Sequence, residues 1–147
     1  MKKIIITLSL ALTAVFSQAQ EYAIITTVES IVPGGVGRSR MISSLDTVNY
    51  NQYTTNRYDG KKSDQGSVNR KDLKINQLSE TKLLNFYSMV GINFQNIASN
   101  DALIESKLNE MAKNGWKLVH VVSGVESDAG KEDGEGIFIT RYIFYRE

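Results

Sequence analysis

The chain has 147 residues, with 17 Lys and Arg against 16 Asp and Glu, one His and no Cys. A formal net charge of +1 gives no indication of nucleic-acid binding, which calls for a clearly basic domain. The absence of cysteine excludes disulfides, thiol catalysis and the usual structural zinc sites, so stability has to come from packing.

The first 19 residues have the three parts of a secretory signal peptide. Lys2 and Lys3 form the basic start, an uncharged run of 13 residues follows, and small residues precede a cleavage point after Ala19. The run is shorter than the roughly 20 apolar residues of a membrane span. We therefore expect signal peptide 1–19, export to the periplasm or the medium, and no span after cleavage. Without Lys2 and Lys3, 15 basic residues face 16 acids, a net charge of −1.

Residues 20–147 are enough for a single domain with its own core. The segment 21–31 is rich in β-branched residues and predicts a strand. The glycine-rich segment 31–41 follows, with Gly34, Gly35 and Gly37. It lacks the Gly-Lys-Ser/Thr of a phosphate-binding loop and the spacing of a dinucleotide-binding loop. We interpret it as a bend, followed by an extended piece at 38–43.

Arg38 and Arg40 are two residues apart, so an extended backbone puts both on one face. Paired guanidiniums suit a carboxylate, sulfate or phosphate on a glycan, lipid or protein partner. A solvated edge strand whose charges deter aggregation is the alternative interpretation, and charged edges are common.

Residues 44–72 form a long polar insertion. Its tyrosines, Tyr50, Tyr53 and Tyr58, are good contact residues because tyrosine offers area at low entropic cost. A partly disordered loop would have the same composition.

The second half predicts two helices and two strands. Apolar spacing indicates a helix near 79–90 and the main helix at about 101–114, with Asn100 as its cap. Strands are expected at 116–122 and 136–145. The last strand is apolar on both faces, so a second helix or a partner subunit should cover its second face, which makes a homodimer possible. The fold class is α+β, with three to four antiparallel strands packed on one main helix.

The stretch from Leu108 to Val119 carries a recognisable helix-to-strand motif. Leu108-Asn109, Ala112, Gly115, Trp116 and Leu118 fit the pattern L-N-x-x-[AG]-x-x-G-W-[EK]-L-V. This resembles a bacterial family of small β-α-β-β domains of unknown function, and the resemblance covers about 45 C-terminal residues and the first strand. It implies that Gly115 ends the helix and that Trp116 packs into the core. It implies no activity, because the family has no established catalytic residues.

Catalytic and metal-binding patterns are absent from the sequence. His120 is expected to be packed on its strand beside Trp116, Leu118 and Val122. The acidic connection 126–135 does not have the spacing of a calcium loop. We therefore expect no metal and no cofactor.

The sequence thus predicts an exported, non-catalytic binding or assembly module of the cell envelope, with an envelope protein or an anionic ligand as its partner. Its expected contact residues are Gly34, Gly35, Gly37, Arg38, Arg40, Tyr50 and Tyr53. The alternative is a hydrolase that acts on envelope glycans through paired carboxylates.

Overall fold

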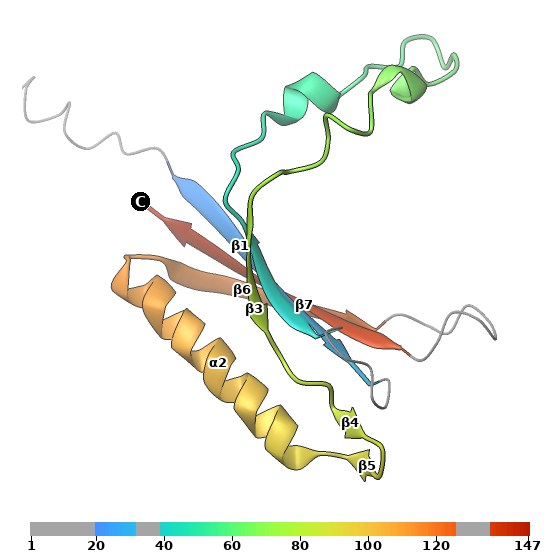
Figure 1. Ribbon diagram of the computed structural model, residues 1–147. Coiled ribbons are helices and arrows are strands. Elements are labelled where there is room, and N and C mark those ends of the chain that lie inside the picture. Colours follow the sequence, from blue (N-terminus) through green and yellow to red (C-terminus); the bar gives the residue numbers. More distant parts are fainter. Residues whose placement is uncertain (1–19, 32–38, 126–135) are drawn as a thin grey trace, which may run out of the picture.

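The fold consists of a five-stranded antiparallel sheet with one long helix packed against it (Figure 1). The computed structural model describes residues 20–31, 39–125 and 136–147. The strand order is β3-β2-β1-β7-β6, and a two-stranded hairpin, β4-β5, precedes the helix. The predicted α+β class is confirmed, with one strand more than the upper expected number.

In chain order, the strands and the long helix are β1 Glu21–Ser30, β2 Arg40–Ser44, β3 Leu78–Lys82, β4 Tyr87–Ser88, β5 Gly91–Ile92, α2 Phe94–Lys113, β6 Lys117–Val125 and β7 Ile137–Arg146. Two short 3-10 helices, η2 Tyr50–Tyr53 and η3 Gln65–Ser67, lie in the polar insertion.

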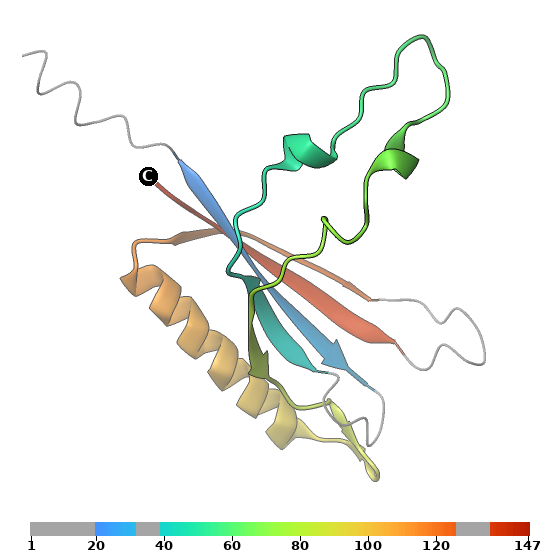
Figure 2. The same cartoon turned by 45° about the horizontal axis from the view of Figure 1, so that its top comes forward.

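The core lies between α2 and one face of the sheet, which we call the inner face. Ile25, Met41, Leu83, Met111 and Phe144 are buried together there. Alternate residues of each strand point to the opposite side, the outer face. Figure 2 shows α2 on one side of the sheet only.

The glycine-rich segment connects an antiparallel pair, since Thr26 pairs with Ile42 and Val28 with Arg40. This agrees with a bend between two strands. Residues 32–38, with Gly34, Gly35, Gly37 and Arg38, lie outside the described residues, as do the predicted signal peptide 1–19 and the acidic connection 126–135.

The helix predicted near 79–90 is wrong. Residues 78–82 are strand β3, which pairs with β2 along its whole length. The expected apolar stripe is not buried together, because Leu83 is 2% exposed whereas Val90 is 97% exposed. Pairing with a neighbouring strand outweighs the local helical spacing, which is a weak determinant in so short a segment.

The main helix begins earlier than the predicted residue 101. Asn93 caps α2 by accepting a hydrogen bond from the Asn96 backbone N–H. Asn100, the predicted cap, lies inside the helix and is fully buried. Its side chain makes tertiary contacts, so it could not be recognised from local helix signals.

Asn100 joins three parts of the fold. Its Oδ1 accepts from the Leu84 backbone N–H at 2.7 Å, and its Nδ2 donates to the Leu84 carbonyl at 2.8 Å. Nδ2 also donates to Glu29 Oε1 at 2.9 Å, across to β1. The side chain therefore satisfies the backbone of Leu84 as a neighbouring strand would, and fixes α2 on the inner face.

The turn after α2 has the geometry that the motif implies. Gly115 has a φ of +82°, the left-handed conformation that glycine adopts without strain. Trp116 is half-buried and packs against the core cluster. The Arg146 guanidinium lies 4.5 Å from the centre of its ring, a cation–π contact. Leu118, on the inner face of β6, is 45% exposed.

The polar insertion is an arm between β2 and β3 that projects away from the sheet (Figures 1 and 2). Its base is closed where Asp46 Oδ2 accepts from the Asn76 and Gln77 backbone N–H groups at 2.7 and 3.0 Å. Further out, the Tyr53 hydroxyl donates to the Asp72 carbonyl at 2.7 Å. Within the described part of the chain, no helix has the length and apolarity to cross a membrane.

Replacing Asn100 by Ala should lower the free energy of unfolding by about 2–4 kcal/mol, because both Leu84 backbone groups and Glu29 lose their partner. Urea unfolding followed by circular dichroism measures this. Glu105→Ala, on the exposed side of the same helix, is the matched control and should change stability by less than about 0.5 kcal/mol. Equal stability of the two variants would refute the role given to Asn100.

Candidate functional site

Among the described residues, no helix lies over the outer face of the sheet, which carries many aliphatic side chains (Figure 2). Strand alternation and register place Ile24 and Val28 of β1 beside Ile143 and Ile139 of β7. Ile24 is 52% exposed, and Val122 on β6 is 57% exposed. A sheet face with this composition is normally covered, so the outer face is a candidate contact surface.

The edge strand β6 is exposed along its whole length. Leu118, Val121 and Val125 lie on its inner face and are 45%, 53% and 61% exposed. The strand has one charged residue, Lys117, at its first position and no proline. The opposite edge, β3, is five residues long and carries Glu80 and Lys82. One edge of the sheet is therefore protected by charge and shortness, whereas the β6 edge has only Lys117 at its start and the β-bulge between Leu118 and His120.

The charged residues of the outer face are mostly cations. By register they are Arg40, Lys82, Lys117 and Arg141, with Glu80 as the acid. Arg40 Nη1 lies 2.6 Å from Glu80 Oε1, and Lys117 Nζ lies 3.8 Å from Glu147 Oε1. Arg141 is exposed, and no acid in the described part of the chain forms an ion pair with it.

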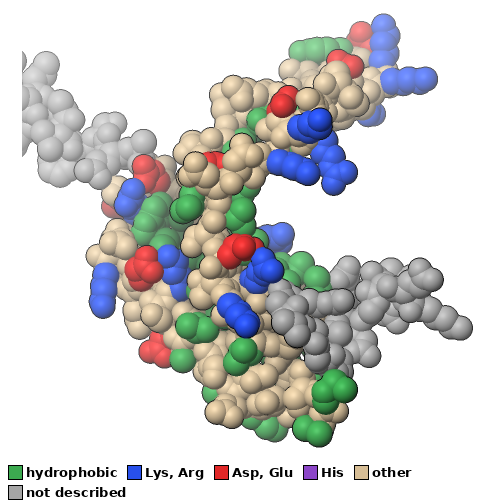
Figure 3. Space-filling view, viewed as in Figure 1, with side chains coloured by type: hydrophobic (Ala, Val, Ile, Leu, Met, Phe, Trp, Pro, Cys, Tyr) green, Lys and Arg blue, Asp and Glu red, His purple; other side chains and the backbone are tan. Residues whose placement is uncertain are grey.

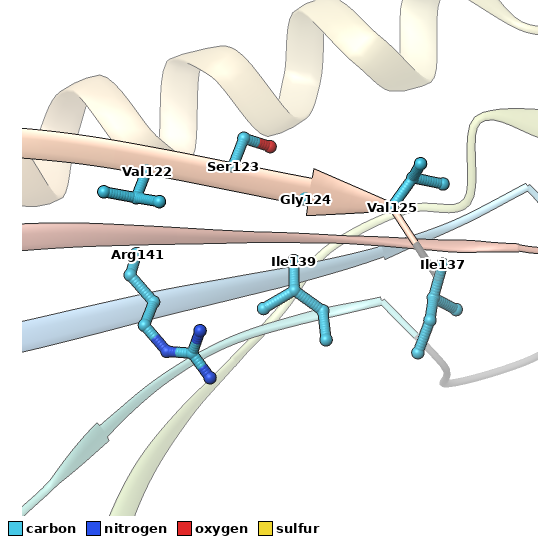
Figure 4. Close-up of a pocket in the computed structure, with 7 residues that line it drawn as sticks. All are labelled: Val122, Ser123, Gly124, Val125, Ile137, Ile139 and Arg141. Atoms are coloured by element: carbon cyan, nitrogen blue, oxygen red, sulfur yellow. The ribbon is translucent and has the colours of Figure 1, made fainter. Parts of the chain in front are cut away.

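A groove of about 400 Å³ lies beside Arg141 (Figure 4). It is lined by residues 122–125 of β6 and by Ile137, Ile139 and Arg141 of β7. In the figure Ile137, Ile139 and Arg141 point away from α2, whereas Ser123 and Val125 point toward the helix side. One unpaired cation thus borders an aliphatic groove, which suits a ligand with an apolar body and one anionic group.

The residues expected from the sequence to bind a partner are not gathered at one place. Arg40 already pairs with Glu80 and lies opposite Lys82 at the β2–β3 edge. Tyr50 and Tyr53 are in the arm, beyond the other end of β2; Tyr50 is 72% exposed, and the Tyr53 hydroxyl is held by Asp72. Lys and Arg side chains gather along the arm (Figure 3), so it remains a second charged surface.

His120 is not packed as expected. A β-bulge between Leu118 and His120 shifts the register, so Leu118 is opposite Phe144 and His120 is opposite Ile143. The bulge turns the histidine to the outer face with Val122, where it is exposed. A bulge adds one residue and reverses the alternation, which is why the period-two interpretation was right about Val122 and wrong about Leu118 as a neighbour of His120.

A polar cluster on the inner face of the sheet contains Glu29, whose carboxyl has a shifted pKa. Burial raises the pKa of Glu29 above its ordinary 4.5, the hydrogen bond from Asn100 opposes the rise, and the nearby Asp101 adds to it. Burial also raises the pKa of Tyr142. The Thr27 hydroxyl is fully buried and has no partner that meets the geometry of a hydrogen bond. It lies close to the Tyr142 hydroxyl and opposes the rise in the pKa of Tyr142.

This cluster gives little support to the glycan hydrolase. The Glu29 carboxylate is half-buried and is already held by Asn100. It lines neither the groove beside Arg141 nor the smaller one at Arg40, Glu80 and Lys82. Among residues 20–31, 39–125 and 136–147, no three His, Cys, Asp or Glu side chains come close enough together to hold a metal ion.

No family model matches the chain, and comparisons with curated proteins and with solved structures give no match either. The resemblance carried by the helix-to-strand motif therefore stays a prediction.

The cation that borders the groove was not singled out from the sequence, although a signal for it exists. Arg141 has the same parity as Ile137, Ile139 and Ile143, so period two puts a charge in the middle of an aliphatic row. A charge at such a position indicates an open face and not a buried one.

The raised pKa of Glu29 predicts how stability depends on pH. Around and above pH 4.5 the unfolded chain loses this proton before the folded chain does, so stability falls as pH rises toward the folded pKa. Glu29→Gln keeps an acceptor for Asn100 and removes the titration, so its stability relative to the unsubstituted protein should increase from pH 4 to pH 7. Urea unfolding across this range measures the difference. A relative stability that is constant or decreases with pH would contradict the assignment.

Proposed function

We propose that the mature chain is a non-catalytic binding or assembly module of the cell envelope, and that the outer face of the sheet is its contact surface. The observation that carries the proposal is the position of α2, which covers the inner face, while Ile24 and Val122 on the outer face are 52% and 57% exposed.

The side-chain composition supports a binding role over a catalytic one. The outer face combines aliphatic residues with cations, and its Arg141 has no acid partner among the described residues. The carboxylate with a raised pKa, Glu29, is on the opposite face and is engaged by a structural amide. Export of the chain is itself part of the proposal, and it rests on the signal-like sequence of residues 1–19.

Self-association is the form of assembly that the sheet favours. The last strand, β7, lies between β1 and β6, so it has no free edge and can offer a partner only its outer side chains. The less protected edge is β6, whose β-bulge lies near its start, between Leu118 and His120. Antiparallel pairing of two copies about a two-fold axis near Val122 would continue the sheet, with Lys117 of each copy away from the centre. No like charges would face each other near that axis.

Photo-crosslinking in the native envelope tests the contact surface. A photoreactive phenylalanine analogue is placed at Ile24 on the outer face, at Tyr50 in the arm, or at Glu105 on the exposed side of α2. We expect a discrete crosslinked product from Ile24 and none from Glu105. Crosslinking from Tyr50 alone would move the contact surface to the arm, and no product from any position would contradict a binding module.

Sedimentation velocity tests the pairing of β6. Val121→Lys puts a charge on the edge strand and should convert a dimer to a monomer at micromolar concentration. Ser106→Lys adds the same charge on the exposed side of α2 and should leave the dimer intact. A monomeric unsubstituted protein, or a dimer that Val121→Lys does not weaken, would refute the pairing.

A further inference from the structure

We propose that the groove beside Arg141 binds a single-chain amphiphile that carries one carboxylate, with the carboxylate on the guanidinium and the hydrocarbon chain along the aliphatic residues of β6 and β7. This assignment rests on the proposed function, because it names the ligand of the outer face.

Charge complementarity argues for an anionic group at this place. Arg141 lies opposite Thr26 on β1 and Val122 on β6, and its neighbours two residues away on β7 are Ile139 and Ile143. None of these side chains carries a negative charge that could neutralise the guanidinium. A guanidinium keeps its charge at every physiological pH and presents donors in a fork that matches a carboxylate in a bidentate arrangement.

The apolar part of the groove argues for a hydrocarbon body. Ile137 and Ile139 point to the same side as Arg141, and Val122 closes the groove from β6 (Figure 4). The volume of about 400 Å³ is in the range of small-molecule sites. The outward-facing isoleucines of β7 continue past Arg141 to Ile143, which lies opposite Ile24 on β1. A ligand with a longer hydrocarbon chain therefore has further aliphatic surface to contact.

The single cation of the groove favours a free amphiphile over a membrane surface. A flat bilayer would contact several cations at once, whereas the groove offers Arg141 alone among its lining residues. Arg40 and Lys82 are at the other edge of the face, where Glu80 pairs with Arg40.

Isothermal titration calorimetry of the purified mature protein with octanoate and decanoate, below their micellar concentrations, tests the assignment. We expect decanoate to bind more tightly, by up to about fourfold for each additional methylene that becomes buried. Decyltrimethylammonium, which has the same chain and the opposite charge, should bind at least about tenfold more weakly.

Arg141→Gln should weaken decanoate binding at least about tenfold, because a charge-assisted bidentate contact is lost. Lys113→Gln removes one positive charge from the exposed last turn of α2, away from the outer face, and should leave binding unchanged. Circular dichroism confirms that both variants fold. Absence of binding, equal loss in the two variants, equal affinity for the cationic amphiphile, or binding only to phosphatidylglycerol vesicles would each overturn the assignment.

Decanoate binding and the crosslink from Ile24 together distinguish a wrong ligand class from a wrong proposed function. If decanoate does not bind while the envelope crosslink from Ile24 is present, the outer face is still the contact surface and only the ligand class is wrong. If both are absent, the proposed function is wrong as well.

Discussion

The buried side chain of Asn100 is the contact on which the arrangement of the layers depends. It satisfies both backbone groups of Leu84 and reaches Glu29 on β1, so one amide joins α2, the segment after β3 and the middle of the sheet. A buried amide without these partners would be costly, so only one placement of the helix satisfies it. Hydrophobic burial by Met111, Ile25 and Phe144 supplies the stabilisation, and Asn100 selects the geometry.

A single helix held in this way can cover only part of a five-stranded sheet. The inner face is filled over β1, β2 and β7, while β6 and the whole outer face lack a covering layer among the described residues. Ile24, Val122 and Val125 are therefore more than half exposed. The functional proposals all follow from this feature: the outer face for a ligand, and the edge of β6 for a second copy. The cations that border this aliphatic surface suit an anionic partner.

Local patterns in the sequence were sufficient for the α+β class, the strands 21–31 and 136–145, and the body of the main helix. They were insufficient where a distant contact decides the structure. Residues 78–82 pair with β2 although their spacing favours a helix, and Asn100 serves Leu84 although its position resembles a cap. The bulge after Leu118 puts His120 on the opposite face from Leu118, although period two predicted one face for both. Of the candidate site, Arg40 and the arm tyrosines were found as exposed polar residues, but the groove beside Arg141 depends on which face the helix leaves open.

Methyl NMR of the isoleucine-labelled protein without residues 1–19 distinguishes the outer face from the other surfaces, because isoleucines lie on both faces of the sheet and on the helix. The protein is titrated with a detergent-free extract of the native envelope. We expect shift changes at outer-face residues such as Ile24, Ile139 and Ile143, with Ile25 and Ile104 unaffected. Changes confined to Ile104 on the helix or to Ile75 at the base of the arm would contradict it.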